Sequence, residues 1–141
     1  MSLALRQSPP SIDGSDRLAA NTYAALLETI DQSVIFTDLD GRIHFWNSGA
    51  SRIFGYSADE MLGRSPAILY PEEDPGRFAR DLERIVAGED FVGEWRGRRR
   101  DGSPVTVDIR TTMVRDPAGT PLGFLGVSRR VAADGSRTGP I

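Results

Sequence analysis

Two stretches of the chain repeat apolar residues at the three- and four-residue spacing of an amphipathic helix. The first covers residues 15–30, where the apolar stripe consists of Ala19, Tyr23, Leu26 and Ile30, widened by Leu18 and Leu27. The second covers residues 75–88, where one face is apolar and Gly88 supplies a stop signal. We therefore predict an N-terminal amphipathic helix over 15–30 and another helix over 75–88.

Shorter runs have the composition and alternation of strands, at residues 34–37, 42–46, 91–98, 105–114 and 122–129. Asn47 or Ser48 can cap a short helix that ends near Gly55, and Ser57 with Glu60 has the spacing of a capping box. The order strand, strand, helices, strand, strand, strand predicts an α+β fold. We expect one domain over 31–131, between a disordered N-terminal segment (1–14) and a flexible tail (132–141).

Three motifs lie at the ends of these elements. Phe45–Gly63 contains a strand end and two short helices with their caps, Arg99–Gly102 occupies a hairpin tip, and Gly123–Ser128 forms the last strand. Together they resemble the PAS domain family. The resemblance implies a five-stranded antiparallel sheet in spatial order 2-1-5-4-3, short helices over one face and a small pocket between the layers. It also implies an ion pair between Glu60 and Arg100, which joins the helices to the hairpin.

Strand alternation, together with the resemblance, separates residues that face the helices from residues that face away. Val107 and Ile109 alternate with Asp108 and Arg110, so the odd positions of that strand face inward. The residues predicted to line the pocket are Ile35, Thr37, Ile43, Phe45, Trp95, Val107, Ile109, Phe124 and Ser128. Two interpretations stay open: these side chains simply close an apolar core, or they surround a ligand.

The opposite face of the same strands is also largely apolar, although a face exposed to water should be polar. Burial of such a patch contributes about 25 cal/mol per Å². This face and the N-terminal helix supply the residues predicted to form a homodimer, which are Tyr23, Leu26, Leu27, Ile30, Phe36, His44, Trp46, Leu125 and Val127. Such association is common in PAS proteins. The alternative is that the helix folds back and covers the sheet of its own chain.

The amino-acid composition limits the functions that the chain can be expected to have. The chain of 141 residues has no cysteine, one histidine and no phosphate-loop, dinucleotide or nucleophile-elbow motif, so we expect no enzyme activity and no metal site. A net charge of -3 gives no field to attract nucleic acid, and no apolar run approaches the roughly 20 residues that cross a bilayer. A cytoplasmic protein is the default. Arginine supplies every basic residue, which points to a GC-rich bacterial genome.

Comparison with the cofactor-binding members of the PAS family predicts no cofactor. Light sensors of the LOV type carry a reactive cysteine in a segment that in this chain is Gly63–Pro66. The amides that bind their flavin have no counterpart at the aligned positions, which are Gly97, Val107 and Ser128. Haem sensors use a histidine on the helix over 75–88, which has none. Three alternatives stay open: a haem held by His44, an FAD stacked on Trp95, and a small organic or fatty acid.

These expectations favour a module of bacterial signal transduction that acts through homodimerisation and protein contacts. Its partner would be a histidine kinase or another signalling protein. The alternative is a sensor domain that binds a small molecule or cofactor in the pocket. PAS domains usually continue into an effector through a helix opened by Asp-Ile-Thr, whereas this chain continues as Arg130-Val131-Ala132. Either an effector has been cut away, or the domain works alone.

Overall fold

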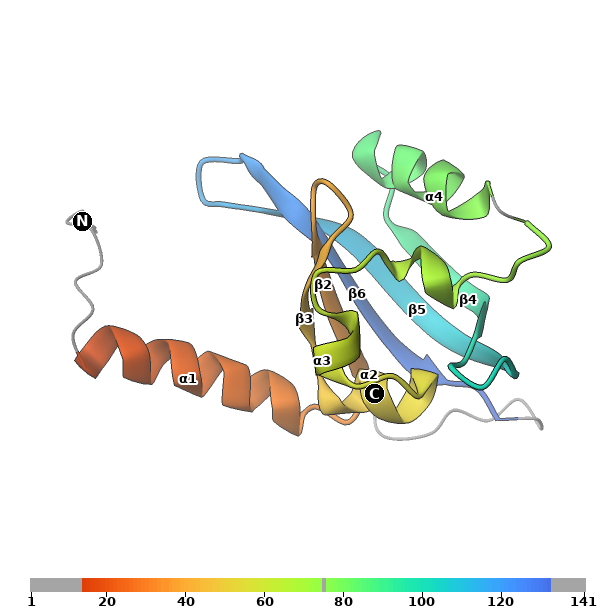
Figure 1. Cartoon of the computed structure of the whole chain (residues 1–141). Coiled ribbons are helices and arrows are strands. Elements are labelled where there is room, and N and C mark those ends of the chain that lie inside the picture. The colour runs from red at the N-terminus through yellow and green to blue at the C-terminus, as the bar shows by residue number, and fades with distance from the viewer. Residues whose placement is uncertain (1–13, 75, 133–141) are drawn as a thin grey trace.

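An antiparallel sheet forms the centre of the structure (Figure 1). The computed structural model describes residues 14–74 and 76–132. Within them the strands are β2 (Ser33–Asp38), β3 (Ile43–Trp46), β4 (Phe91–Arg98), β5 (Pro104–Arg115) and β6 (Pro121–Arg130). Their spatial order is β3-β2-β6-β5-β4, which is the order 2-1-5-4-3 implied by the resemblance. The α+β class and the topology are confirmed.

Short helices cover one face of this sheet (Figure 1). They are α2 (Ser48–Phe54), α3 (Ala58–Met61), the 3-10 helix η1 (Pro66–Leu69) and α4 (Arg77–Val86). Asn47 caps α2 by accepting a hydrogen bond from the Ala50 N–H, while Ser57 and Glu60 form the predicted capping box of α3. Because helices this short gain little from their own backbone ladder, these caps decide where they begin.

The core lies between the helices and the inner face of the sheet. Its largest fully buried side chains include Phe54, Ile43, Met61 and Val107. Trp46 and Trp95 belong to the same cluster. The Trp46 indole N–H donates to Ser51 Oγ and to the Tyr56 carbonyl, at 3.0 Å in each case. The core therefore buries this aromatic ring without leaving its polar group unsatisfied.

A β-bulge in β3 changes which residues face the core. The register pairs Phe36 with Phe45 and then Thr37 with Ile43, so that His44 is passed over. One extra residue reverses the alternation along a strand. Trp46 is therefore inside, 2% exposed, and Phe45 lies on the outer face opposite Phe36. The predictions that Phe45 lines the pocket and that Trp46 lies on the outer surface are wrong for this reason.

The N-terminal helix, α1 (Gly14–Thr29), agrees with the helix predicted over 15–30. It projects away from the sheet and does not fold back over it (Figure 1). Tyr23 is 67% exposed and Leu26 is 57% exposed, so these two apolar residues of α1 are uncovered in the single chain. The disorder predicted for 1–14 and 132–141 concerns segments that, apart from Gly14 and Ala132, lie outside the described residues.

Asn47 joins α1 to the sheet and to α2. Its side chain is almost completely buried and uses both ends of its amide. Asn47 Oδ1 accepts hydrogen bonds from the Val34 and Ala50 N–H groups, both at 2.9 Å. Asn47 Nδ2 donates to carbonyls in the last turn of α1 and just after it, which belong to Leu27 (3.1 Å), Ile30 (3.4 Å) and Gln32 (2.9 Å). The hydrogen bonds of this one side chain thus hold the connection from α1 into β2 in place.

Candidate functional site

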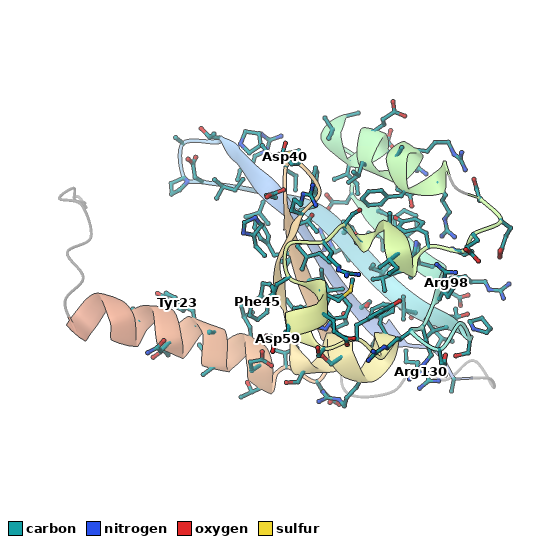
Figure 2. All side chains as sticks on the ribbon, in the orientation of Figure 1. Tyr23, Asp40, Phe45, Asp59, Arg98 and Arg130 are labelled. Carbon is teal, nitrogen blue, oxygen red and sulfur yellow. The ribbon has the colours of Figure 1, made fainter. Side chains whose placement is uncertain are left out.

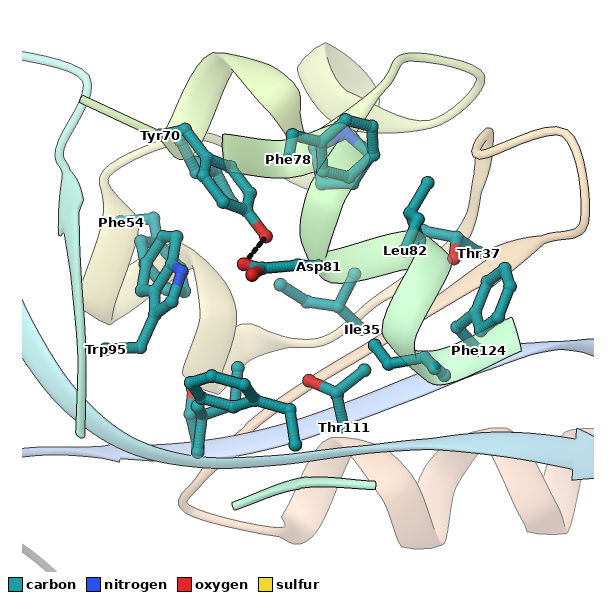
Figure 3. Close-up of a pocket in the computed structure, with 17 residues that line it drawn as sticks. Ile35, Thr37, Phe54, Tyr70, Phe78, Asp81, Leu82, Trp95, Thr111 and Phe124 are labelled. Carbon is teal, nitrogen blue, oxygen red and sulfur yellow. Dashed lines mark hydrogen bonds between the residues drawn. The ribbon is translucent and has the colours of Figure 1, made fainter. Parts of the chain in front are cut away.

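A cavity of about 100 Å³ lies between the helix layer and the inner face of the sheet (Figure 3). Its sheet wall includes the predicted residues Ile35, Thr37, Trp95, Ile109, Phe124 and Ser128. Ile43 and Val107, which were also predicted to line it, are buried in the core beside the cavity and not on its wall. Alternation therefore identified the inward face of β5 and β6, where no bulge intervenes at these positions, but it did not separate the cavity wall from the core beside it.

Most of the helix wall was missed by the prediction, which considered strands alone. This wall includes Leu69, Tyr70, Phe78, Asp81, Leu82 and Ile85. Asp81 is the informative member, because it is the one charged side chain on the wall of a mostly apolar space (Figure 3). A signal was present in the sequence: Asp81 falls three residues after Phe78 and four before Ile85, on the apolar face of the helix.

The Tyr70 hydroxyl donates a hydrogen bond of 3.0 Å to Asp81 Oδ2 (Figure 3). Burial, and after it the Asp81 carboxylate, raises the pKa of Tyr70 well above its ordinary value of 10.0, so the phenol stays protonated and remains a donor. The Tyr70 ring also makes edge contacts with Phe78 and Trp95, with centroids 5.2 and 5.1 Å apart. These contacts fix the position from which Tyr70 reaches Asp81.

Arg77 covers the outside of this group. Its guanidinium carbon lies 5.5 Å from the centroids of both the Tyr70 and the Trp95 rings. Arg77 Nε is 3.9 Å from Asp81 Oδ2, and Arg77 Nη1 donates to the Arg96 carbonyl at 3.2 Å. Arg77 therefore ties the start of α4 to β4 and gives Asp81 a counter-charge at long range.

The outer face of the sheet is a second candidate surface. Phe36 lies opposite both Phe45 and Leu125 in the register, so their side chains share one face. A Cβ on Gly123 would lie 2.6 Å from the Phe36 ring, which shows that this ring lies against the glycine. The predicted interface residues that the structure leaves partly or fully exposed are Tyr23, Leu26, Leu27, Ile30, Phe36, His44, Leu125 and Val127. Phe45 takes the place that was predicted for Trp46, and Figure 2 labels it together with Tyr23.

His44, the bulge residue, belongs to the hairpin between β2 and β3. Its side chain is 59% exposed, and its Nε2 lies 2.6 Å from Asp38 Oδ2. Asp38 Oδ1 accepts hydrogen bonds from the backbone N–H groups of Asp40 and Arg42, both at 2.9 Å. The Arg42 N–H, and next the His44 ring, hold the pKa of Asp38 below its ordinary value of 3.8. These bonds close the turn and form no pocket.

Glu60 and Arg100 meet where α3 approaches the hairpin between β4 and β5. Arg100 Nη2 lies 2.8 Å from Glu60 Oε2, and Arg100 Nη1 donates to Glu60 Oε1 at 3.1 Å. The Arg100 N–H also donates to the Phe54 carbonyl at 2.8 Å. This exposed pair positions the hairpin against the helices, and it takes no part in the cavity.

The family model described as the PAS fold matches residues 21–131. The chain belongs to the PAS family. This match covers the sheet, the helix layer and the last part of α1. PAS domains of this kind occur in sensory and signalling proteins, as the relatives described next illustrate.

The Two-component system protein A of Emericella nidulans is 33% identical over 111 residues, which are 77% of this chain and 16% of that protein. Sensor protein FixL of Bradyrhizobium diazoefficiens is 32% identical over 97 residues, which are 65% of this chain and 19% of that protein. The chain thus spans less than a fifth of either relative. A PAS domain from Colwellia psychrerythraea superimposes with a TM-score of 0.71 at 21% identity, covering 80% of this chain and 97% of that one.

The PAS cavity of this chain does not fit the two cofactors considered from the sequence. Trp95 lies over Gly97, where a Cβ would come within 2.1 Å of the indole ring, so the aromatic ring itself fills the space above β4. A cavity of about 100 Å³ is also far below the roughly 300–1,000 Å³ of pockets that hold larger ligands. His44 is exposed on the bulge and does not line the cavity, so it is no haem ligand there.

Two further properties concern only residues 14–74 and 76–132. No cluster of three or more histidine, cysteine, aspartate or glutamate side chains in this part of the chain is arranged to hold a metal ion. None of its helices is both long and apolar enough to cross a membrane.

Proposed function

We propose that this PAS domain is a signalling module in which two copies associate through α1 and the outer face of the sheet. One observation carries the proposal: α1 is anchored at its C-terminal end, yet its Tyr23 and Leu26 are exposed, and the outer face of the sheet is also apolar and partly exposed. Such a surface is unfavourable in water, and contiguous apolar patches of this kind usually mark interaction sites.

The anchor of α1 is built from polar contacts. Besides the bonds of Asn47, Glu28 Oε1 accepts hydrogen bonds from the Ser48 N–H (2.8 Å) and the Ser48 hydroxyl (2.6 Å). Arg52 and Asp31 form an ion pair of 3.0 Å beside them. The 16 residues of α1 extend about 24 Å from this anchor. The helix is therefore held in a defined direction while its Tyr23 and Leu26 lack a partner within the described chain.

A second copy of the chain is the occupant that suits these surfaces. In a two-fold dimer the same patch serves both subunits, so α1 of each copy can cover the outer face of the other. Both surfaces are apolar, and a net charge of -3 on a chain of 141 residues opposes self-association only weakly. Phe36, Phe45, Leu125 and Val127 would form the sheet side of this contact.

The signal is proposed to pass to a histidine kinase or another signalling protein. This is supported by the relatives, which include a two-component system protein and a sensor protein. Bacterial origin and cytoplasmic location stay predictions from the composition.

Sedimentation over a range of concentrations tests the dimer. Leu26→Glu and Phe36→Glu place a charge on the two halves of the surface, and each should give folded monomers. Val92→Glu is the matched control, because Val92 is 70% exposed on the outer face of β4, at the opposite edge of the sheet from β3. A wild-type protein that sediments as a monomer at every concentration, or equal effects of all three substitutions, would refute this interface.

A second function, sensing of a small molecule, is favoured by a different observation. A carboxylate within a mostly apolar cavity costs free energy unless hydrogen-bond donors surround it. Asp81 occupies such a position, and its side chain is only 16% exposed. Binding sites commonly combine apolar walls with a few polar groups of this kind.

A further inference from the structure

We infer that the cavity takes a small uncharged molecule that consists of one apolar ring and a single N–H or O–H group. This group donates a hydrogen bond to Asp81. This inference rests on the sensor function proposed above. It names the chemical class of the ligand, its protein anchor and the charge states that the site excludes.

Asp81 has acceptor capacity that the protein does not use. An ionised carboxylate offers about four acceptor positions on its two oxygens. Among the described residues, Tyr70 is the one side-chain hydrogen-bond donor to Asp81, and it reaches only Oδ2. The nearest cationic atom, Arg77 Nε, is 3.9 Å from that same oxygen. A ligand donor at the remaining positions would therefore supply a charge-assisted hydrogen bond inside an apolar space, where such bonds are strong.

The charges around Asp81 favour an uncharged ligand. A cation would have to compete with Arg77, which already stacks over the Tyr70 and Trp95 rings and lies beside the carboxylate. An anion would be confined next to Asp81 in a small cavity of low dielectric constant, where like charges repel strongly. The organic or fatty acid considered from the sequence is disfavoured for this reason.

The walls and the volume define the body of the ligand. Apart from Asp81, the helix wall is formed by Phe78, Leu82 and other apolar side chains, and Ile35 and Ile109 face them from the sheet. An apolar cavity of roughly 150 Å³ accommodates benzene. A space of about 100 Å³ therefore suits a single small ring. The hydroxyl groups of Thr37, Thr111 and Ser128 on the sheet wall can donate or accept hydrogen bonds, so they do not discriminate between types of ring.

Three probes that share a five-membered aromatic ring test the inference on the full chain. Pyrrole has one N–H donor, furan has the same ring without a donor, and pyrrole-2-carboxylate adds a negative charge. Dissociation constants would be measured by calorimetry and by NMR titration of the backbone amides. We expect pyrrole to bind at least about tenfold more tightly than furan, as a hydrogen bond to a charged acceptor implies. Pyrrole-2-carboxylate should bind more weakly than pyrrole.

Three variants assign the effect to Asp81. In Asp81→Leu the preference for pyrrole over furan should disappear while furan still binds. Asp81→Asn keeps an acceptor oxygen without the charge and should give an intermediate preference, which secures the test if the leucine variant fails to fold. Asp59→Leu removes an exposed carboxylate from α3 and should leave the preference unchanged.

Gly126→Val locates the binding. Gly126 lines the cavity, and a Cβ there meets its nearest neighbour, Thr111 Oγ1, at an ordinary 3.6 Å. The added methyl groups should fill the cavity and abolish binding of every probe. Equal binding of pyrrole and furan by the wild type, with both blocked by Gly126→Val, would overturn the role of Asp81 and leave the sensor function standing. No saturable binding of any probe would overturn both, and sedimentation of the same samples would show whether the dimer survives independently.

Discussion

The two faces of the sheet are built from the same strands and yet differ in what covers them. The inner face meets α2, α3, η1 and α4, and it contains the core and a small cavity. The outer face carries Phe36, Phe45 and Leu125 but is left partly exposed. The inner face therefore stabilises the single chain, whereas the outer face has apolar area available for another molecule. In β3, just after the bulge, Phe45 lies on the outer face and the adjacent Trp46 lies in the core.

The largest effect on stability should come from Trp46, and the comparison is its neighbour Phe45 on the opposite face of the sheet. Trp46→Ala removes a buried ring and its two hydrogen bonds, so the free energy of unfolding should fall by about 3–5 kcal/mol. Phe45→Ala should cost the monomer much less, because Phe45 is partly exposed. Urea unfolding of both variants at a concentration where the protein is monomeric measures the difference. Equal losses would contradict the bulge.

Asn47→Asp should separate α1 from the rest of the domain. The aspartate keeps the oxygen that accepts from Val34 and Ala50, but it replaces the donor amide with an oxygen that faces the three carbonyls around the end of α1. We expect a loss of about 2–3 kcal/mol, together with faster hydrogen exchange in α1. Asn47→Ala is the control that also removes the cap of α2. If α1 were equally protected in the wild type and Asn47→Asp, Asn47 would not be its anchor.

Part of the loss of stability in acid should originate at two turns. The Arg42 N–H and the His44 ring lower the pKa of Asp38, and the Ser103 hydroxyl and N–H lower the pKa of Asp101, both from an ordinary value of 3.8. A carboxyl group whose pKa is lower when folded stabilises the protein above the unfolded value, and this contribution is lost as the pH falls through the folded pKa.

The unfolding midpoint in urea should therefore decrease as the pH falls below about 4, and Asp38→Asn combined with Asp101→Asn should flatten this decrease. An unchanged profile in the double variant would place the acid-sensitive groups elsewhere.

The smallest effect is expected from Glu60→Gln. The pair with Arg100 is exposed, so its loss should scarcely change stability, and any change should vanish at high salt. Faster hydrogen exchange at the tip of the hairpin, around Gly102, would show that the pair positions this hairpin. A large loss of stability would mean that the pair contributes to the core, contrary to its exposure.

The fold could be predicted because its signals are local. Caps at Asn47 and Ser57, turn residues between strands and the spacing of apolar residues each act over a few positions, and they agree with one another. The bulge at His44 could not be predicted in the same way, because Ile43-His44-Phe45 alternates between apolar and polar residues as a regular strand does. Its position depends on the pairing of β2 with β3, which is a relation between two segments.

The candidate site could be predicted only on its sheet side. A strand shows which residues share a face, so Ile109, Phe124 and Ser128 were identified. The helix wall required knowing that η1 and α4 bring Tyr70 and Asp81 together across 11 positions of sequence. Asp81 is a charged residue at a position that the helical pattern assigns to the apolar face, and such a mismatch often marks a functional site.

The cavity also makes the protein sensitive to hydrostatic pressure. A folded chain that leaves about 100 Å³ of mostly apolar space unfilled occupies more volume than the same chain after water has entered that space. Compression should therefore favour unfolding, and Gly126→Val should raise the pressure at which the domain unfolds. A molecule that fills the same space would have the same effect, so resistance to pressure would report occupation of the cavity even for a ligand that has no colour.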